Sequence, residues 1–176
     1  KIWHTGSGTP PNMKIKEVRS NIAALKTNSE LGSHHPLHPN DDVNKSQSTN
    51  DTFPAAIQIS VVTEIIKKLV PSLRELTKVL DRKSNEWKNI IKIGRTHFQD
   101  AVPISLGQEV SAWSKQLKDA EDALVMSLDE LFFLPLGGTA VGTGINCPKE
   151  FSKESIKSIS EDTGPVSYTH LTLPTR

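Results

Sequence analysis

Residues 55–90, AAIQISVVTEIIKKLVPSLRELTKVLDRKSNEWKNI, carry the pattern that decides the fold. Apolar side chains recur there at alternating intervals of four and three residues, which is the spacing of a helix packed against other helices. Pro71 lies inside the run and predicts a kink or short break near Val70, because proline lacks an N–H and clashes with the preceding turn. The seam consists of Ala55, Ile59, Val62, Ile66, Leu69, Leu73, Leu76, Leu80, Lys83, Trp87 and Ile90, with Lys83 as its one break.

The same spacing returns further along the chain and predicts a second long helix. The second seam consists of Leu106, Val110, Trp113, Leu117, Ala120, Leu124, Ser127 and Leu131. Shorter amphipathic helices are predicted from Asn12 to near Gly32 and from Pro148 to Glu161. We therefore expect an all-α protein built as a long-helix bundle, and seams of this length indicate oligomerisation. A freestanding coiled coil without chemistry is the alternative that periodicity alone leaves open.

Composition narrows the class of protein further. The chain has 176 residues, 35% hydrophobic and 23% charged, and its 21 basic and 20 acidic residues are interspersed. No charge block indicates nucleic acid or an anionic membrane as a partner. Cys147 is alone, which excludes an internal disulfide and fits a reducing compartment. No signal peptide or membrane span is visible. Because the chain starts at Lys1 and enters a motif at once, we expect a truncated fragment.

Residues 38–53, HPNDDVNKSQSTNDTF, form the densest polar run in the chain. Ser, Thr, Asn and Lys side chains offer hydrogen-bond donors in several directions, as a pocket for small carboxylates requires. An apolar helical repeat follows directly and anchors the run, so we expect a site here. In the alternative interpretation, Asn50 or Asp51 only caps the following helix and the rest is a solvated turn.

Two further polar segments interrupt the helical pattern. Residues 3–13, WHTGSGTPPNM, form a glycine-rich loop whose two prolines we expect to bar any helix before Asn12. Residues 92–103, KIGRTHFQDAVP, lie between the two apolar seams. The glycine spacing does not match a nucleotide-binding loop. No metal site is expected, because prolines separate His34, His35 and His38 and no zinc-type spacing follows.

Four of these segments together resemble class II fumarases of the fumarase/aspartase superfamily, over about residues 1 to 164. They are WHTGSGTPPNM at 3–13, HPNDDVNKSQSTND at 38–51, GRTHFQDA at 94–101 and LGGTAVGTGIN at 136–146. Departures from the family pattern include the Pro10–Pro11 pair, Lys14 where Asn is common, Thr49 for Ser, and Phe98 for Leu. The resemblance implies reversible, cofactor-free and metal-free addition of water to fumarate, giving (S)-malate, by a homotetramer.

The resemblance also assigns roles to residues. His97 is the catalytic candidate that handles water, and residues 136–146 are a wall of the pocket. A second anion site comprises His38, Pro39, Asn40 and Asp41. The substrate-binding candidates are Ser7, Gly8, Thr9, Ser48, Thr49, Asn50 and Thr96. The family's catalytic base lies on a GSSxMPxKxNP loop that this sequence lacks, so the fragment alone is expected to be inactive.

Domain limits, location and rival functions complete the expectations. Residues 1–50 are expected to end an amino-terminal lyase domain and 51–164 to start a central helical domain. Residues 165–176 resemble a translated adaptor, and we expect a non-native tail.

A cytoplasmic location is expected, with the mitochondrial matrix as the alternative. Aspartase is the closest rival activity; His97, His38 and the GSGT of residues 6–9 favour a fumarase. A non-catalytic helical assembly module is the rival from another class.

Overall fold

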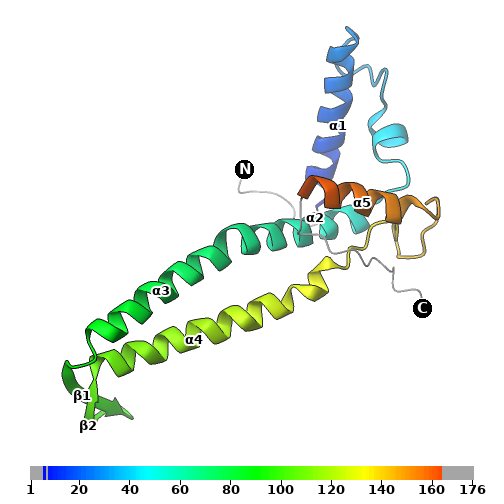
Figure 1. The fold of residues 1–176 in the computed structure, drawn as a ribbon. Helices are drawn as coiled ribbons and strands as arrows, with labels where there is room; N and C mark the ends of the chain where they lie inside the picture. Colours follow the sequence, from blue (N-terminus) through cyan, green and yellow to red (C-terminus); the bar gives the residue numbers. More distant parts are fainter. Residues whose placement is uncertain (1–5, 7, 164–176) are drawn as a thin grey trace. The chain divides into compact units, whose positions relative to one another are not determined.

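The computed structural model describes residue 6 and residues 8–163, which form two compact units. The first unit takes in the described residues up to Ser60 and from Leu131 onward, and the second spans Val61–Glu130. The expected all-α, long-helix class is confirmed (Figure 1). The elements in order are α1 (Thr9–Lys26), the π turn η1 (Pro39–Val43), α2 (Thr49–Glu64), the π turn η2 (Ile65–Leu69), α3 (Val70–Glu86), β1 (Ile91–Thr96), β2 (Gln99–Ser105), α4 (Leu106–Ser127), the 3-10 turn η3 (Asp129–Phe132) and α5 (Phe151–Thr163).

Helix α1 begins earlier than the sequence suggested. The prediction that two prolines bar any helix before Asn12 is wrong, since α1 starts at Thr9 and holds both in its first turn. Proline is tolerated there because the first N–H groups of a helix have no partner within the helix. Gly8 caps this end with φ 72°, and a Cβ at Gly8 would collide with the Phe53 ring. The helix ends at Lys26 rather than near Gly32.

The break predicted near Val70 is present as η2. The Val70 N–H donates to the Ile65 carbonyl five residues earlier, and helical residues continue without interruption into α3. A π turn holds one more residue than an α turn. Buried residues accordingly lie at Ala55, Val62, Val70 and Thr77, so the spacing of seven becomes eight across η2. The proline was visible in the sequence, whereas the one-residue shift of the buried face was not.

Helices α3 and α4 run side by side within the second unit (Figure 1). The fully buried residues of this pair are Val70 and Thr77 on α3 and Gly107, Val110 and Ser114 on α4, none of which has a large side chain. Gly107 allows the closest approach, because a Cβ there would meet the Ser84 carbonyl and the Lys88 backbone. A capping box in which Ser105 and Gln108 bond each other's backbone N–H starts α4.

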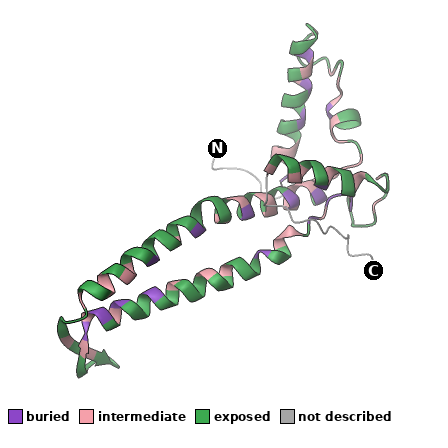
Figure 2. Cartoon of the chain, viewed as in Figure 1, coloured by how far each residue is buried: buried purple, intermediate pink, exposed green. Residues whose placement is uncertain are grey.

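Buried, half-buried and exposed residues alternate along α3 and α4 (Figure 2), and the predicted apolar seams are only partly covered in this chain. Val62 and Val110 of the seams are buried, and Leu73 and Leu117 are half-buried. Leu69 keeps 43% of its surface exposed, Leu76 47% and Trp113 49%. The helix–helix contact that the seams predict is present. It includes Val110 of the second seam, together with Thr77 and Ser114, which each lie one residue beyond a seam position. Helix α4 has 22 residues, shorter than its seam, because the chain turns into η3 at Asp129. No helix among the described residues is both long and apolar enough to cross a bilayer.

The polar segment between the seams is a β-hairpin, which the sequence analysis did not predict. Strands β1 and β2 pair antiparallel, with Ile91 opposite Ser105 and Thr96 opposite Gln99. The register shifts between Ile93 and Arg95, and Gly94 between them lies close to the Val102 carbonyl. Gly94 and Pro103 interrupt the helical period here, and the short apolar alternation of Ile91, Ile93, Val102 and Ile104 around them is the pattern of strands.

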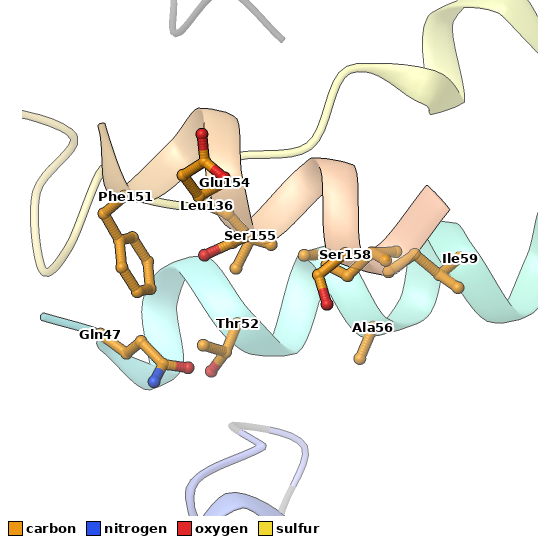
Figure 3. A pocket seen from close by; sticks show the side chains of 11 residues that line it. Gln47, Thr52, Ala56, Ile59, Leu136, Phe151, Glu154, Ser155 and Ser158 are labelled. Atoms are coloured by element: carbon orange, nitrogen blue, oxygen red, sulfur yellow. The ribbon is translucent and has the colours of Figure 1, made fainter. Parts of the chain in front are cut away.

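The first unit has a small apolar core. Ala55 of α2 is buried against Leu134 and Leu136, and Ile59 and Ile159 pack on this cluster. Beside it, α2 and α5 line a hollow of about 560 Å³ (Figure 3). Helix α5 starts three residues later than the predicted Pro148 and ends at Thr163. The predicted tail, residues 165–176, lies outside the described residues.

Candidate functional site

A groove of about 450 Å³ lies where the polar run meets the glycine- and threonine-rich loop of the first unit. The polar run contributes its residues 40 and 44–48, and the loop faces it with residues 139–141, 143, 145 and 146. Two of the predicted site residues, Asn40 and Ser48, line this groove. The segments are about 90 residues apart in sequence, so the fold and not local sequence creates the groove.

The start of the polar run is fixed by a histidine cap. His38 Nδ1 accepts from the backbone N–H groups of Asn40 at 3.3 Å and Asp41 at 3.1 Å. The His38 N–H in turn donates to the Asp42 carboxylate at 2.8 Å. Asp41 Oδ2 also lies 3.3 Å from Nδ1, as an ion pair would require. Nδ1 can accept these two N–H groups only where it carries no proton of its own.

Ser48 and Asp51 cap the first turn of α2 reciprocally. The Asn50 N–H donates to Ser48 Oγ at 3.2 Å, and the Ser48 N–H donates to Asp51 Oδ1 at 2.9 Å. Thr52 adds a hydroxyl bond to the Ser48 carbonyl at 2.7 Å. Such paired caps satisfy N–H groups that a helix start leaves free. The capping role that the sequence offered as an alternative is therefore real, and it places Ser48 rigidly at the groove.

Asp51 also joins the polar run to the opposite wall. Its Oδ2 accepts from the Thr139 N–H at 2.8 Å, and its exposed fraction is 2%. Next to it, the Asn50 side-chain amide donates to the Ala140 carbonyl at 2.9 Å. Burial, followed by the charge of Asp51, raises the pKa of the nearby Cys147 thiol. One buried carboxylate thus holds both sides of the groove.

The remaining first-unit candidates lie at the start of α1 and beside it. Thr49 Oγ1 accepts from the Asn12 side-chain amide at 2.6 Å, which connects α1 to α2. Thr9 is exposed at the first position of α1, directly after Gly8. Ser7 lies outside the described residues. Asn12 was not among the predicted site residues, although its place in the NM pair after two prolines was visible.

Thr96 and His97 belong to the second unit, on the β1–β2 hairpin. His97 and Phe98 form its turn with φ 45° and 64°, and both are exposed. Arg95 braces the turn by donating to the Phe98 carbonyl at 3.0 Å. The His97 ring has a tilted contact with the Phe98 ring, with the centroids 6.1 Å apart.

Neither a metal site nor the hollow between α2 and α5 is a stronger candidate than the groove. Within residues 8–163, no cluster of three His, Cys, Asp or Glu side chains is placed to hold a metal ion. The hollow between α2 and α5 is lined by apolar Ala56, Ile59 and Phe151, with Glu154 as its acid (Figure 3). It offers fewer hydrogen-bond donors than the groove. The groove is therefore the better candidate for binding a small anion.

Comparison with known proteins identifies the family. A lyase family matches residues 1–173. The chain is 86% identical over 168 residues to a fumarate hydratase class II from Prochlorococcus marinus subsp. pastoris, covering 96% of this chain and 36% of that protein. It is 50% identical over 164 residues to the fumarate hydratase class II of Chlamydia trachomatis, covering 93% and 35%. The chain thus spans about a third of the length of these relatives.

Solved structures give the same result. The crystal structure of the class II fumarase from Schistosoma mansoni superposes with a TM-score of 0.85 at 44% identity, covering 98% of this chain and 37% of that one. A fumarate lyase:delta crystallin from Brucella melitensis superposes with a TM-score of 0.84 at 36% identity, covering 96% and 36%. The chain belongs to the lyase family and, over its length, is similar to class II fumarate hydratases.

Proposed function

We propose that this chain forms part of a fumarate hydratase that adds water reversibly to fumarate, giving (S)-malate. The observation that supports it best is the groove in which Ser48 faces the glycine- and threonine-rich loop, with Asp51 bonded to both sides. Hydration places a hydroxyl on one alkene carbon and a proton on the other. The intervening carbanion spreads its charge onto the neighbouring carboxylate, so donors aimed at that carboxylate lower the barrier.

The donors are the residues singled out from the sequence. Ser48, Asn50 and Thr49 come from the start of α2, and Gly8 and Thr9 come from the start of α1. Ser7 and Thr96 complete the substrate-binding set. His97 handles the water, because an imidazole can accept and return a proton near neutral pH. The base that removes the proton from carbon is assigned to a loop that this sequence does not contain.

We also propose the second anion site at His38, Pro39, Asn40 and Asp41, but with fewer groups that donate to the anion. The Asn40 and Asp41 backbone N–H groups already donate to His38 Nδ1, so they are not free for an anion. Asn40 Oδ1 accepts from Lys16 Nζ at 3.2 Å, which leaves the Asn40 side-chain N–H groups available. In this proposal, the Asn40 amide is therefore the anion donor of the segment.

Assembly, domains and location belong to the same proposal. The exposed apolar residues of α3 and α4, such as Leu76 and Trp113, would be covered in a homotetramer of the whole protein. The boundary near residue 50 concerns domains of that longer protein. We assign the whole protein to the cytoplasm, because a bacterial relative is a fumarate hydratase class II and the lone Cys147 fits a reducing compartment.

A chimeric enzyme tests the function. Residues 1–164 would replace the matching segment of the Prochlorococcus relative, and absorbance of fumarate would be followed with malate or aspartate as substrate. We expect conversion of malate and none of aspartate. Preference for aspartate would replace the proposal by an aspartase, and loss of both activities in a folded chimera would leave only a helical assembly role.

A further inference from the structure

We propose that a third cavity of the first unit, between α1 and residues 43–56, binds a small organic anion with two or three carboxylates, held by Lys16 and Arg19. This cavity, here called the α1 cavity, has a volume of about 340 Å³. It shares Asn44 and Gln47 with the groove, but its other residues come from α1, Val43 and the first turns of α2 rather than from residues 139–146. The proposal does not depend on which reaction the protein catalyses.

Lys16 is the observation that carries the inference. Its exposed fraction is 9%, although it lies in the middle of α1. Among the described residues, its ammonium has a single bonding partner, the neutral Asn40 Oδ1 at 3.2 Å. Burying a charge without an opposite charge is costly, and such charges in proteins are normally paired. The missing counter-charge is what a bound anion would supply.

Arg19 adds a second cation on the same side of the helix. It follows Lys16 by three residues, so the two side chains are neighbours on α1, where like charges repel. No ion pair involves either residue within the described part of the chain. The nearest acid on α1, Glu17, instead pairs with His34 at 3.3 Å. Two uncompensated cations facing one cavity favour an anion that carries more than one charge.

The rest of the lining indicates an organic carboxylate. Its polar members beside the two cations are Asn12, Asn44, Gln47 and Thr52, which are neutral, and its lining includes no aspartate or glutamate. Amides and hydroxyls can donate to carboxylate oxygens without adding charge. Its apolar members are Pro11, Ile15, Val43, Phe53 and Ala56. A compact inorganic anion would leave that apolar surface unfilled, whereas a carbon skeleton of a few atoms would contact it.

The test uses the chimera described above, with thermal midpoints measured against increasing succinate, citrate, phosphate and sulfate at constant ionic strength. Lys16→Met removes the buried charge and keeps the chain length. Lys14→Met is the matched control, since Lys14 is exposed two residues away and does not line the cavity. All variants would also be made in a Ser48→Ala background, which weakens any response from the groove.

We expect saturable stabilisation by succinate or citrate, with half-saturation shifted about tenfold or more in Lys16→Met and unchanged in Lys14→Met. Arg19→Gln, at an exposed position, should shift it in the same direction and carries the test if Lys16→Met does not fold. Identical responses in all variants would overturn the proposal, and equal responses to phosphate and sulfate would overturn the organic class. A chimera that fails to hydrate fumarate but keeps the Lys16-dependent response would refute only the proposed function.

Discussion

Asp51 shows how much of the groove depends on one side chain. It accepts from Ser48 on one side and Thr139 on the other, while 2% of its surface is exposed. A carboxylate is suited to this task because it accepts through two oxygens at once. The sequence suggested Asp51 only as a helix cap; its second partner, 88 residues away, could not be found without the fold.

Replacing Asp51 by Ala in the chimera should destabilise the protein strongly. Each buried N–H left without a partner costs about 1–3 kcal/mol, so the free energy of unfolding should fall by a few kcal/mol. Asp51→Asn, which keeps one acceptor oxygen, should cost less. Urea denaturation measures both, with the exposed Asp119→Asn as control. Equal stability of Asp51→Ala and the control would show that the groove does not depend on this residue.

His97→Asn separates catalysis from folding at the hairpin turn. The residue is exposed with φ 45°, a region that asparagine tolerates well, so the thermal midpoint should not change. Turnover of fumarate by the chimera should fall by about 10² to 10⁴, the usual effect of losing a positioned proton-transfer group. Steady-state assays on both proteins make the comparison. An unchanged rate would remove His97 from the mechanism.

Hydrogen bonds and ion pairs join α3 to α4 along their length. Ser114 Oγ donates to Asp81 Oδ1 at 2.5 Å, and Lys118 Nζ donates to Asp81 Oδ2 at 2.9 Å. Arg74 pairs with Glu121 at 2.6 Å further along. The Lys118 bond first, and the Ser114 bond second, lower the pKa of Asp81.

The lowered pKa of Asp81 makes the stability of this pair sensitive to acid. A carboxylate that titrates lower in the folded state stabilises it above the unfolded pKa, and this contribution is lost as the pH falls through the folded value. The free energy of unfolding should therefore decline below about pH 4 more steeply than in Asp81→Asn. Urea titrations from pH 7 to pH 3 compare them, with Lys118→Met as a second variant. Parallel curves for all three proteins would show that Asp81 is not coupled to folding.

Several elements were predictable from local pattern, and the reasons for the failures are specific. The helical periods and Pro71 predicted the long helices and the break, because both depend on nearby residues. The hairpin was not predicted, because Gly94 and Pro103 end the helical period without specifying a strand by themselves. The polar run was recognised as a site, but its partner wall at Thr139 and the buried Lys16 depend on distant contacts.

At the scale of the whole molecule, the chain carries apolar surface that its own fold leaves uncovered. Leu69, Leu76 and Trp113 are each more than two-fifths exposed, and they belong to the seams. Exposed apolar surface of this extent normally marks an interface. The chain also spans only about a third of the length of its relatives. It therefore cannot contribute every residue that those longer proteins contain.

The 176-residue chain alone should therefore self-associate and lack fumarate hydration. The exposed apolar residues of α3 and α4 would pack against those of neighbouring molecules. The sequence also contains no segment that matches the loop to which the catalytic base is assigned. Size-exclusion chromatography with light scattering and a fumarate assay measure both properties. A monodisperse monomer would contradict the first expectation, and robust turnover would contradict the second.

The π turn η2 has a consequence for changes in chain length. Because Ile65–Leu69 already hold one residue more than an α turn, deleting a single residue there converts the turn to ordinary helix without rotating α3 about its axis. A deletion inside α3, for example of Lys78, instead rotates every later side chain by about 100° and removes Asp81 from Ser114. Deletion of Lys67 should therefore leave a chimera that melts close to the parent, while deletion of Lys78 should lower the midpoint sharply. The helical run from Thr49 to Glu86 thus contains a turn, η2, at which the loss of one residue can be absorbed.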